Sequence, residues 1–327
     1  MHVLITGGAG FIGSHLVEYH LAKGDKVQAV DDLSTGSREN IAPFLGKPEF
    51  HFVQADILTW PELEKAAAWA DRIYHMAAVV GVYRVLADPI KVLATNIAGT
   101  ERLLRAISKG GWEPHVIIAS SSEVYGHSAA RELREDAELI IQSGARSRWN
   151  YAVSKLADEA LGISYARKDG VPITIVRFCN TIGPRQTGRY GMVVPRFINQ
   201  AIQNEPLTVY GDGTQTRSFC DARDTVVALD LLASNDASAG EIVNVGNNRE
   251  ISIRDLAKMV IQRTGSPSTI QYIPYLDAYG EEFEDITHRR PALDKLFRLT
   301  HFSHQWNLEQ TLDDLAQRAR PEVREVV

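Results

Sequence analysis

The sequence has only two cysteines, Cys179 and Cys220, among its 327 residues. Two cysteines are too few for a disulfide framework, and they lack the spacing of a metal site. No uncharged apolar run reaches the roughly 20 residues that a membrane-spanning helix needs. The N-terminus also lacks the charged start, apolar run and small-residue cleavage site of a signal peptide. These absences predict a cytoplasmic protein with no metal centre.

An excess of positive charge is absent as well. The chain has 35 Lys and Arg against 41 Asp and Glu, a formal net charge of -6. This balance gives no reason to expect a nucleic acid or a membrane surface as a partner. Any anionic ligand must therefore be held by local Arg side chains and backbone amides. The 44% hydrophobic content is ordinary for a globular protein, and the length allows one large or two ordinary domains.

Glycines recur at every third position after the first apolar run. His2–Thr6 is expected to be a buried strand, and Ser14–Lys23 a helix. Between them Gly7 permits a tight turn, Gly10 lets backbone amides approach a pyrophosphate, and Gly13 lets helix and strand pack closely. A strand, a glycine turn and a helix in this order predict a dinucleotide site.

An acidic pair follows the second expected strand, Lys26–Val30. Asp31 at its end can accept hydrogen bonds from both hydroxyls of an adenosine ribose. Asp31 and Asp32, with no Arg immediately after them, favour NAD over its 2′-phosphorylated form. Arg38 lies close enough in the sequence to leave that second form open.

The strand and helix pattern continues through the first half of the chain. It predicts an α/β fold of the Rossmann type, with a doubly wound parallel sheet and a smaller mixed α/β C-terminal substrate domain. We expect an NAD-binding domain over 1–177, a return of the chain to it around 222–248, and a second domain over 178–327. Further strands are expected at Phe50–Val53, Arg72–Met76, His115–Ala119, Ile173–Arg177, Leu207–Tyr210 and Ile242–Val245, and helices at Pro61–Trp69, Asp88–Ser108, Arg148–Glu159, Met192–Asn204 and Arg223–Ala233.

Tyr151 and Lys155 share one face of the helix expected over Arg148–Glu159, because they are four residues apart. A cation beside a phenol stabilises the phenolate, so the pKa of Tyr151 is predicted to fall toward neutrality. Such a phenol could accept the proton of an alcohol that is being oxidised. Ser121 follows a buried strand and could hydrogen-bond the same alcohol. A Tyr and a Lys at this spacing are common on solvated helix faces, so the pair alone is a weak signal of catalysis.

The second half contains scattered arginines. Arg185, Arg189, Arg217 and Arg289 could converge on one anionic ligand, since the guanidinium group bonds phosphate and carboxylate bidentately. Taken singly, Arg185, Arg196 and Arg290 are predicted to be surface residues.

Together these residues resemble the extended short-chain dehydrogenases that act on nucleotide sugars. The resemblance covers nearly the whole chain and is carried by Gly7–Gly13, Asp31–Gly36, Ser121 with Tyr151 and Lys155, and Pro206–Arg217. It implies an enzyme that oxidises carbon 4 of a UDP- or dTDP-sugar with tightly bound NAD, and it permits a homodimer built from two helices of each subunit.

The resemblance also implies the site residues. The catalytic set is Ser121, Tyr151 and Lys155. The expected NAD contacts are Gly7, Gly10, Phe11, Ile12, Gly13, Asp31, Asp32, Ser34, Gly36, Asp56, Ile57, Ala77, Ala78, Asn96, Ser120, Tyr151 and Lys155. The expected UDP-sugar contacts are Ser121, Ser122, Glu123, Tyr151, Asn180, Arg189, Val194, Val209, Tyr210, Gln215, Arg217 and Arg289.

The chain resembles two groups of these enzymes that differ in what happens to the 4-keto sugar. The stretch from Asn180 to Arg217 is similar to UDP-hexose and UDP-glucuronate 4-epimerases. Glu123 and Arg289 are similar to residues of UDP-glucuronate decarboxylases, where they are taken to assist loss of carbon dioxide. Arg189 could hold the uronate carboxylate against that loss. We therefore expect 4-epimerisation of UDP-glucuronate to UDP-galacturonate, with UDP-glucose and UDP-galactose as a second substrate pair.

Other activities are weaker matches. Decarboxylation of UDP-glucuronate is the alternative. Ser122 stands where dTDP-glucose 4,6-dehydratases have an Asp, which argues against dehydration. An inactive NAD-binding regulator is a remote alternative, because such proteins commonly lack the Tyr, the Lys or the hydroxyl partner.

Overall fold

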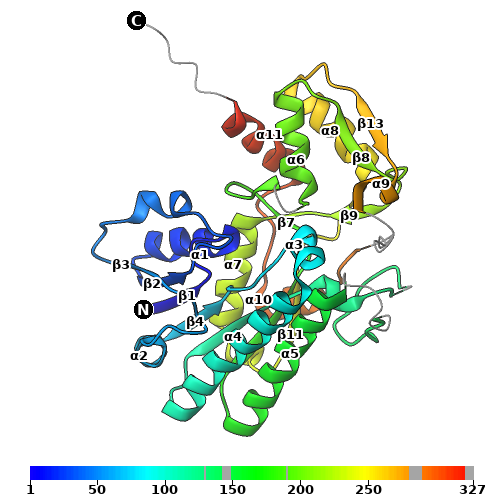
Figure 1. Ribbon diagram of the computed structural model, residues 1–327. Coiled ribbons are helices and arrows are strands. Elements are labelled where there is room, and N and C mark those ends of the chain that lie inside the picture. The colour runs from blue at the N-terminus through cyan, green and yellow to red at the C-terminus, as the bar shows by residue number, and fades with distance from the viewer. Residues whose placement is uncertain (129, 142–148, 189–190, 280–288, 321–327) are drawn as a thin grey trace, which may run out of the picture.

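The computed structural model describes residues 1–128, 130–141, 149–188, 191–279 and 289–320. A central sheet and its helices form the larger part of the molecule, and a smaller group of helices and strands sits over one edge (Figure 1). The fold class is the one predicted. The central sheet has seven strands: β1 (His2–Thr6), β2 (Lys26–Asp31), β3 (Phe50–Gln54), β4 (Arg72–His75), β5 (His115–Ser121), β6 (Ile173–Phe178) and β11 (Ile242–Val245).

All of these strands are parallel, in the order β3-β2-β1-β4-β5-β6-β11. The chain first builds outward from β1 in one direction and then continues from β4 in the other. In open parallel sheets a ligand binds outside the carboxyl ends of the strands where this reversal occurs. The turn after β1 and the residues after β4 therefore mark the expected binding edge.

Helices cover both faces of the sheet (Figure 1). One face carries α1 (Phe11–Ala22), α7 (Ala222–Ala233) and α10 (Asp294–Thr300), and the other carries α2 (Leu63–Trp69), α4 (Pro89–Gly110) and α5 (Asn150–Asp169). The short helix α3 (Val82–Ala87) follows β4 and was not predicted. α1 begins three residues earlier than expected, directly after the glycine turn, and β5 runs on to Ser121.

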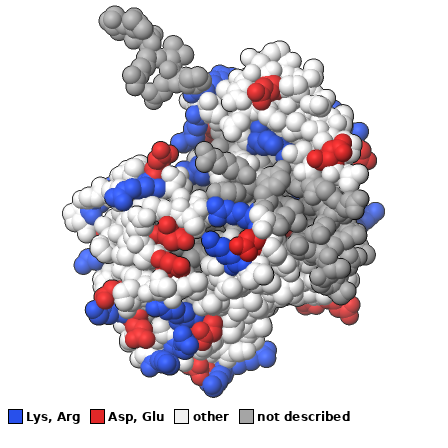
Figure 2. Space-filling view, viewed as in Figure 1, with Lys and Arg blue, Asp and Glu red and all other residues white. Residues whose placement is uncertain are grey.

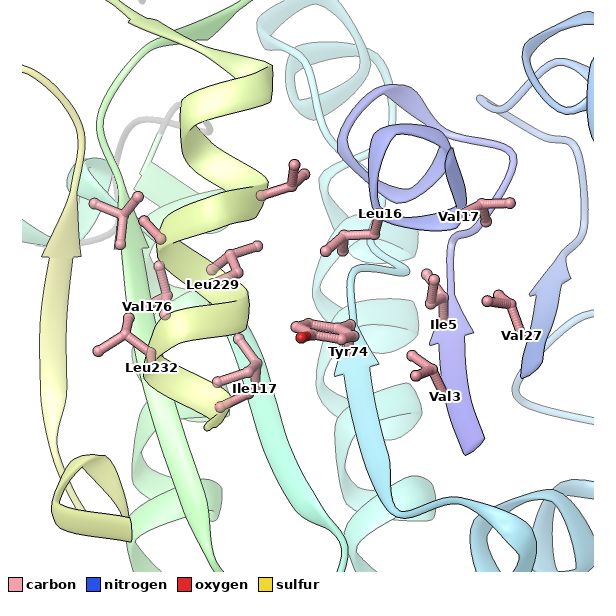
Figure 3. Close-up of a cluster of buried hydrophobic side chains, with 14 of the residues drawn as sticks. Val3, Ile5, Leu16, Val17, Val27, Tyr74, Ile117, Val176, Leu229 and Leu232 are labelled. Atoms are coloured by element: carbon pink, nitrogen blue, oxygen red, sulfur yellow. The ribbon is translucent and has the colours of Figure 1, made fainter. Parts of the chain in front are cut away.

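The core between the sheet and the first helical layer contains the cluster of buried hydrophobic side chains drawn in Figure 3. Leu16 and Val17 come from α1, and Leu229 and Leu232 come from α7. They pack toward strand residues that are almost completely buried, namely Val3, Ile5, Val27, Tyr74, Ile117 and Val176. Because both faces of the sheet are covered, β1 and β5 read as nearly continuous apolar runs, which is why the sequence predicted them well.

The smaller part contains α6 (Val193–Ile202), α8 (Ile253–Thr264) and α11 (Leu308–Ala319) around a cluster of buried apolar side chains. Beside them, β8 (Leu207–Tyr210) pairs with β13 (Ile270–Ile273), which leads into α9 (Tyr275–Tyr279). Two further short pairs are β7 (Thr181–Ile182) with β10 (Cys220–Asp221), and β9 (Thr216–Ser218) with β12 (Glu250–Ser252). α8 and α11 were missed, although buried Ile253, Leu256, Ala257 and Val260 have helical spacing.

The chain crosses between the two parts more than once. α7 packs against α1, and β11 pairs with β6 at the edge of the central sheet. α10 then packs against α7 and β11, a second return that the sequence did not predict. Within the described residues, no helix is long and apolar enough to cross a membrane.

Three buried histidines make stability depend on pH. Burial lowers the pKa of His15 and of His115 to about 4 and that of His75 to about 3, with nearby cations Arg185, Arg72 and Lys155 respectively adding to the effect. Between pH 6.5 and about 4 the unfolded chain therefore binds protons that the folded chain does not. The free energy of unfolding should therefore decrease as the pH is lowered through this window, by about 1.4 kcal/mol per pH unit for each histidine.

Urea denaturation at pH 7, 6 and 5 measures this dependence. His115 bonds Thr174 on β6, well inside the sheet, and His115→Gln should reduce the slope by the contribution of this one histidine, up to about 1.4 kcal/mol per pH unit. An unchanged slope in this variant would show that His115 is already protonated in the folded protein.

Candidate active site

A single cavity of about 510 Å³ runs along the carboxyl edge of the central sheet and into the smaller part. Its walls come from the loops after β1, β2, β4, β5 and β6, from the first turns of α5 and α6, and from the β8–β9 region. Figure 2 shows basic and acidic side chains close together in the middle of the molecular face, between the two parts. The cavity brings together most residues that the sequence had singled out.

The glycine turn forms one end of the cavity. Gly7 has φ +69°, and a Cβ added there would lie 2.8 Å from the Ala77 amide nitrogen, so only glycine fits. The turn thereby lies directly against the end of β4, and α1 begins directly after it at Phe11. A helix N-terminus with close backbone approach suits a pyrophosphate. Gly10, Phe11, Ile12 and Gly13 all line the cavity.

Asp31 lies beside this turn, held by backbone amides. Its carboxylate accepts hydrogen bonds from the Ala9 nitrogen at 3.0 Å and the Leu33 nitrogen at 2.8 Å. A Cβ on Gly36 would be 2.9 Å from both carboxylate oxygens, which explains a glycine at that position. Asp31 lines the cavity, and Arg38 does not. The residues present therefore fit an adenosine ribose with a free 2′-hydroxyl.

The other predicted dinucleotide contacts fall into two groups. Asp32, Ser34, Asp56, Ile57, Ala77, Ala78 and Ser120 line the cavity. Asn96 does not: it is 2% exposed and bonds the backbone of Val79 and the hydroxyl of Ser154. Gly36 also lies outside the wall. These two support the loops that form the wall.

Tyr151 and Lys155 lie in the cavity wall on the first turns of α5, with Ser121 at the end of β5. Burial raises the pKa of Tyr151 above its usual value, and the carboxylates of Glu123 and Asp158 add to this rise. The Lys155 ammonium and, less strongly, the Ser121 hydroxyl lower the pKa, but burial outweighs both. The predicted fall toward neutrality is therefore wrong for the protein chain by itself, because desolvation penalises the phenolate more than one paired cation stabilises it.

A buried ion pair between Glu159 and Arg177 joins α5 to the central sheet. The Arg177 guanidinium donates hydrogen bonds to both Glu159 carboxylate oxygens, at 2.9 and 2.8 Å. Glu159 also accepts a hydrogen bond from the Ser120 hydroxyl at 2.6 Å. Both members of the pair are at least 97% buried. The pair joins α5 to β6 and fixes Ser120, so the Ser120 hydroxyl is used within the protein.

Glu123 and Arg289 meet in the same cavity. The Arg289 Nη1 lies 2.5 Å from the Glu123 Oε1, and the two side chains are 9% and 23% exposed. The segment of Arg289 is tied to the body of the protein by hydrogen bonds from the Leu133 nitrogen to the Arg290 carbonyl and from the Ser218 hydroxyl to the Arg289 carbonyl. A carboxylate and a guanidinium thus face the space beside Tyr151.

The far end of the cavity lies in the smaller part. Of the expected UDP-sugar contacts, Asn180, Val194, Tyr210, Gln215 and Arg217 line this end, and Ser122 lines the cavity just after β5. Asn180 donates to the Ser218 carbonyl at 3.0 Å, and Gln215 donates to the Tyr210 carbonyl at 3.1 Å. Val209 is fully buried in the adjoining core and does not line the cavity, because side chains alternate along β8. The predicted contact Arg189 lies outside the described residues.

Two arginines are not the surface residues that were predicted. The Arg196 guanidinium lies 4.1 Å from the centre of the Tyr210 ring and lines the cavity. Arg185, 18% exposed in its side chain, bonds Glu18 and His15 of α1 and so joins the two parts. Arg290, which pairs with Glu132 at 3.5 Å, is half-buried, with its side chain 42% exposed.

Several lining residues had no signal in the sequence. They include Val79, Val80, Gln186, Met192, Phe219 and Tyr275. Apolar and amide side chains of this kind occur throughout a chain, and only the folded arrangement selects them. Arg196 and Tyr210 had a detectable signal, since an arginine and an aromatic ring are both suited to a planar, charged ligand.

Comparisons with known proteins agree with this geometry. The model of the NAD dependent epimerase/dehydratase family matches residues 3–246. The chain is 38% identical over 315 residues to a UDP-N-acetyl-alpha-D-glucosaminuronate decarboxylase of Bacillus cytotoxicus, with 96% of each chain covered. It is 34% identical over 316 residues to UDP-glucuronic acid decarboxylase 1 of Danio rerio, covering 96% of this chain and 72% of that protein.

Solved structures give the same picture. A UDP-glucuronic acid 4-epimerase from Bacillus cereus, in complex with UDP-glucuronic acid and NAD, has a TM-score of 0.86 at 29% identity, covering 98% and 99% of the two chains. A dTDP-glucose 4,6-dehydratase from Streptomyces venezuelae, with NAD bound, also has a TM-score of 0.86 at 29% identity, covering 97% and 96%. With NAD as its cofactor, this chain belongs to the NAD-dependent epimerase/dehydratase family.

Proposed function

We propose that this enzyme oxidises a UDP-linked uronic acid at carbon 4 and then releases its carboxylate as carbon dioxide. The carrying observation is the Glu123–Arg289 pair in the cavity that also contains Tyr151 and Lys155. The curated relatives described above support it, since both are named as decarboxylases of UDP-uronates. The sequence had favoured epimerisation on account of Arg189, which lies outside the described residues.

In the first step Tyr151 takes the proton of the 4-hydroxyl group, while Ser121 bonds the same oxygen. NAD, when bound, would accept the hydride. Burial keeps the Tyr151 pKa high, and the Lys155 ammonium works against it, as the positive charge of the oxidised cofactor would also do. Geometry and charge at these three side chains thus support oxidation at carbon 4.

The second step follows from the chemistry of the oxidised sugar. A 4-keto uronate is a β-keto acid, so the bond from carbon 5 to the carboxylate can break with its electron pair moving into the carbonyl group. Tyr151, now protonated, can donate to the enolate oxygen. Arg289 is already neutralised by Glu123 at 2.5 Å, so it holds a substrate carboxylate less firmly than a free cation would. Glu123 can direct a water molecule that protonates carbon 5. Return of the hydride from the reduced cofactor to carbon 4 would then give the UDP-pentose, whereas release before that return would leave the 4-keto form with the cofactor still reduced.

The UDP portion is assigned to the far end of the cavity. Arg217 supplies positive charge for the diphosphate, and Asn180 and Gln215 supply amide groups. The Tyr210 ring, with Arg196 stacked on it, offers a planar surface for the base. This arrangement accounts for both the nucleotide and the sugar along one continuous cavity.

Epimerisation at carbon 4 is the second candidate. It shares the first step and is supported by the likeness to the Bacillus cereus 4-epimerase.

We also infer a homodimer through α4 and α5, which pack together on one face of the sheet (Figure 1). Ile90 on α4 and Val153 on α5 are exposed apolar side chains on these helices.

Product analysis separates the two candidates. We expect that incubation with UDP-glucuronate or with its 2-acetamido counterpart gives a UDP-pentose or its 4-keto form, and one equivalent of carbon dioxide. Proton NMR identifies the nucleotide product, and trapped carbon dioxide is counted. UDP-galacturonate without gas would replace the proposal with epimerisation, and UDP-glucose serves as the substrate without a carboxylate.

Removal of the Tyr151 hydroxyl should stop the first step. Tyr151→Phe is expected to lower the rate of NAD reduction by at least about 100-fold, because the proton acceptor is lost. Stopped-flow absorbance at 340 nm measures this rate, and calorimetry with UDP should show unchanged affinity. Tyr165→Phe, farther along α5, is the matched control and should behave as the unsubstituted enzyme does. Wild-type rates in Tyr151→Phe would exclude this assignment.

Neutralising Glu123 should affect the second step. In Glu123→Gln, carbon dioxide release is expected to fall by about 100-fold while NAD reduction remains within a few-fold, so that reduced cofactor accumulates. Glu132→Gln changes a surface carboxylate that pairs with Arg290 and should leave both rates unchanged. Equal losses in both steps would show that Glu123 only maintains the shape of the cavity.

A further inference from the structure

Asp158 lies on α5, close behind the catalytic lysine. Its side chain is fully buried, and its Oδ2 accepts a hydrogen bond from the Lys155 Nζ at 3.0 Å. Lys155 lines the cavity, and Asp158 does not. The ammonium group is therefore held between the cavity on one side and a buried carboxylate on the other. The oxidation step described above gives Asp158 no role.

A chain of polar groups lies beside this carboxylate. Burial raises the pKa of Asp158, and Lys155 and the Thr100 hydroxyl on α4 lower it. The Asp158 Oδ1 is buried with no hydrogen-bond partner among the described residues, so Lys155 holds the carboxylate through Oδ2 alone. Thr100 bonds the His75 Nε2 at 3.1 Å, and the His75 Nδ1 bonds the Thr6 hydroxyl at 2.8 Å. Thr100 is thus linked to the ends of β1 and β4, where the glycine turn packs.

The other charged groups around Tyr151 and Lys155 have partners of their own. On α5, Glu159 is paired with Arg177 and bonded by Ser120. In η3 (Ser122–Tyr125), Glu123 is paired with Arg289. On β4, burial keeps His75 neutral with a pKa of about 3. The carboxylate that directly balances the Lys155 charge is therefore Asp158.

We propose that Asp158 is a positioning residue for the oxidation at carbon 4: it anchors the Lys155 ammonium and, by partly neutralising it, sets the pH at which Tyr151 accepts the substrate proton. This inference depends on the oxidation step of the proposed function and is independent of whether carbon dioxide is lost.

The charges give the direction of the effect. Burial lowers the pKa of Lys155, but Asp158 and Tyr151 outweigh burial and raise it, so the lysine stays charged. The same carboxylate raises the pKa of Tyr151, because a phenolate would be a second negative charge in the same buried cluster. Removing the Asp158 charge should therefore make Tyr151 a proton acceptor at lower pH.

Asp158→Asn tests this in the NAD-loaded enzyme. The rate of NAD reduction is measured at 340 nm in single turnovers with UDP-glucuronate between pH 5 and 10. We expect the acidic limb of the profile to move down by about one pH unit, and the plateau rate to fall several-fold as Lys155 loses its anchor. Asp169→Asn is the matched control, since Asp169 bonds Ser108 at the other end of α5.

Asp158→Glu and Asp158→Ala complete the set. The Glu variant retains the charge, so its acidic limb should stay at the wild-type pH while its plateau falls. The Ala variant leaves space for a water molecule beside Lys155, and it replaces Asp158→Asn if that variant does not fold. A wild-type acidic limb in the folded Asn or Ala variant would overturn the proposal. Failure to produce carbon dioxide in all variants would count against the proposed function alone, because the measured step precedes it.

Discussion

The close contact between the glycine turn and the end of β4 is the constraint on which the site depends. A Cβ at Gly7 would lie 2.8 Å from the Ala77 nitrogen, so the two loops can meet only through a glycine. The meeting point is also where the strand order reverses between β1 and β4. The amides of α1, the Asp31 carboxylate and the polar groups after β4 are brought to one edge of the sheet, the edge at which open parallel sheets bind dinucleotides.

Buried charge is the second constraint. Lys155 with Asp158 and Arg177 with Glu159 place two ion pairs along one side of α5, with every member at least 97% buried. Breaking such a pair leaves an uncompensated charge in a medium of low dielectric constant, whereas the intact pair contributes little net stability. The pairs are better explained by positioning: one holds the Lys155 ammonium, and the other joins α5 to β6 so that Tyr151 and Ser121 face the same space.

Much of this could be read from the sequence, for physical reasons. Strands buried on both faces give continuous apolar runs, and the glycine spacing, Asp31, Tyr151 and Lys155 are residue types with few alternatives for their chemistry. Helices such as α8 and α11 cover a small core with one face and are polar elsewhere, so their signal is weaker. The Tyr151 pKa could not be read at all, because neighbour spacing shows Lys155 but not the burial that opposes it. Arg196 and Arg185 were misplaced because their partners Tyr210 and Glu18 are distant in sequence.

The central claim is that the uronate is oxidised at carbon 4 and then loses its carboxylate within one cavity. Turnover of UDP-glucuronate in deuterium oxide, followed by mass spectrometry and NMR of the product, tests it most directly. Loss of carbon dioxide leaves a carbanion equivalent at carbon 5 that must take up a solvent proton, so the account predicts a UDP-pentose with one deuteron at carbon 5. A UDP-hexuronate that carries no deuterium would contradict it, since epimerisation by return of the same hydride leaves carbon 5 untouched.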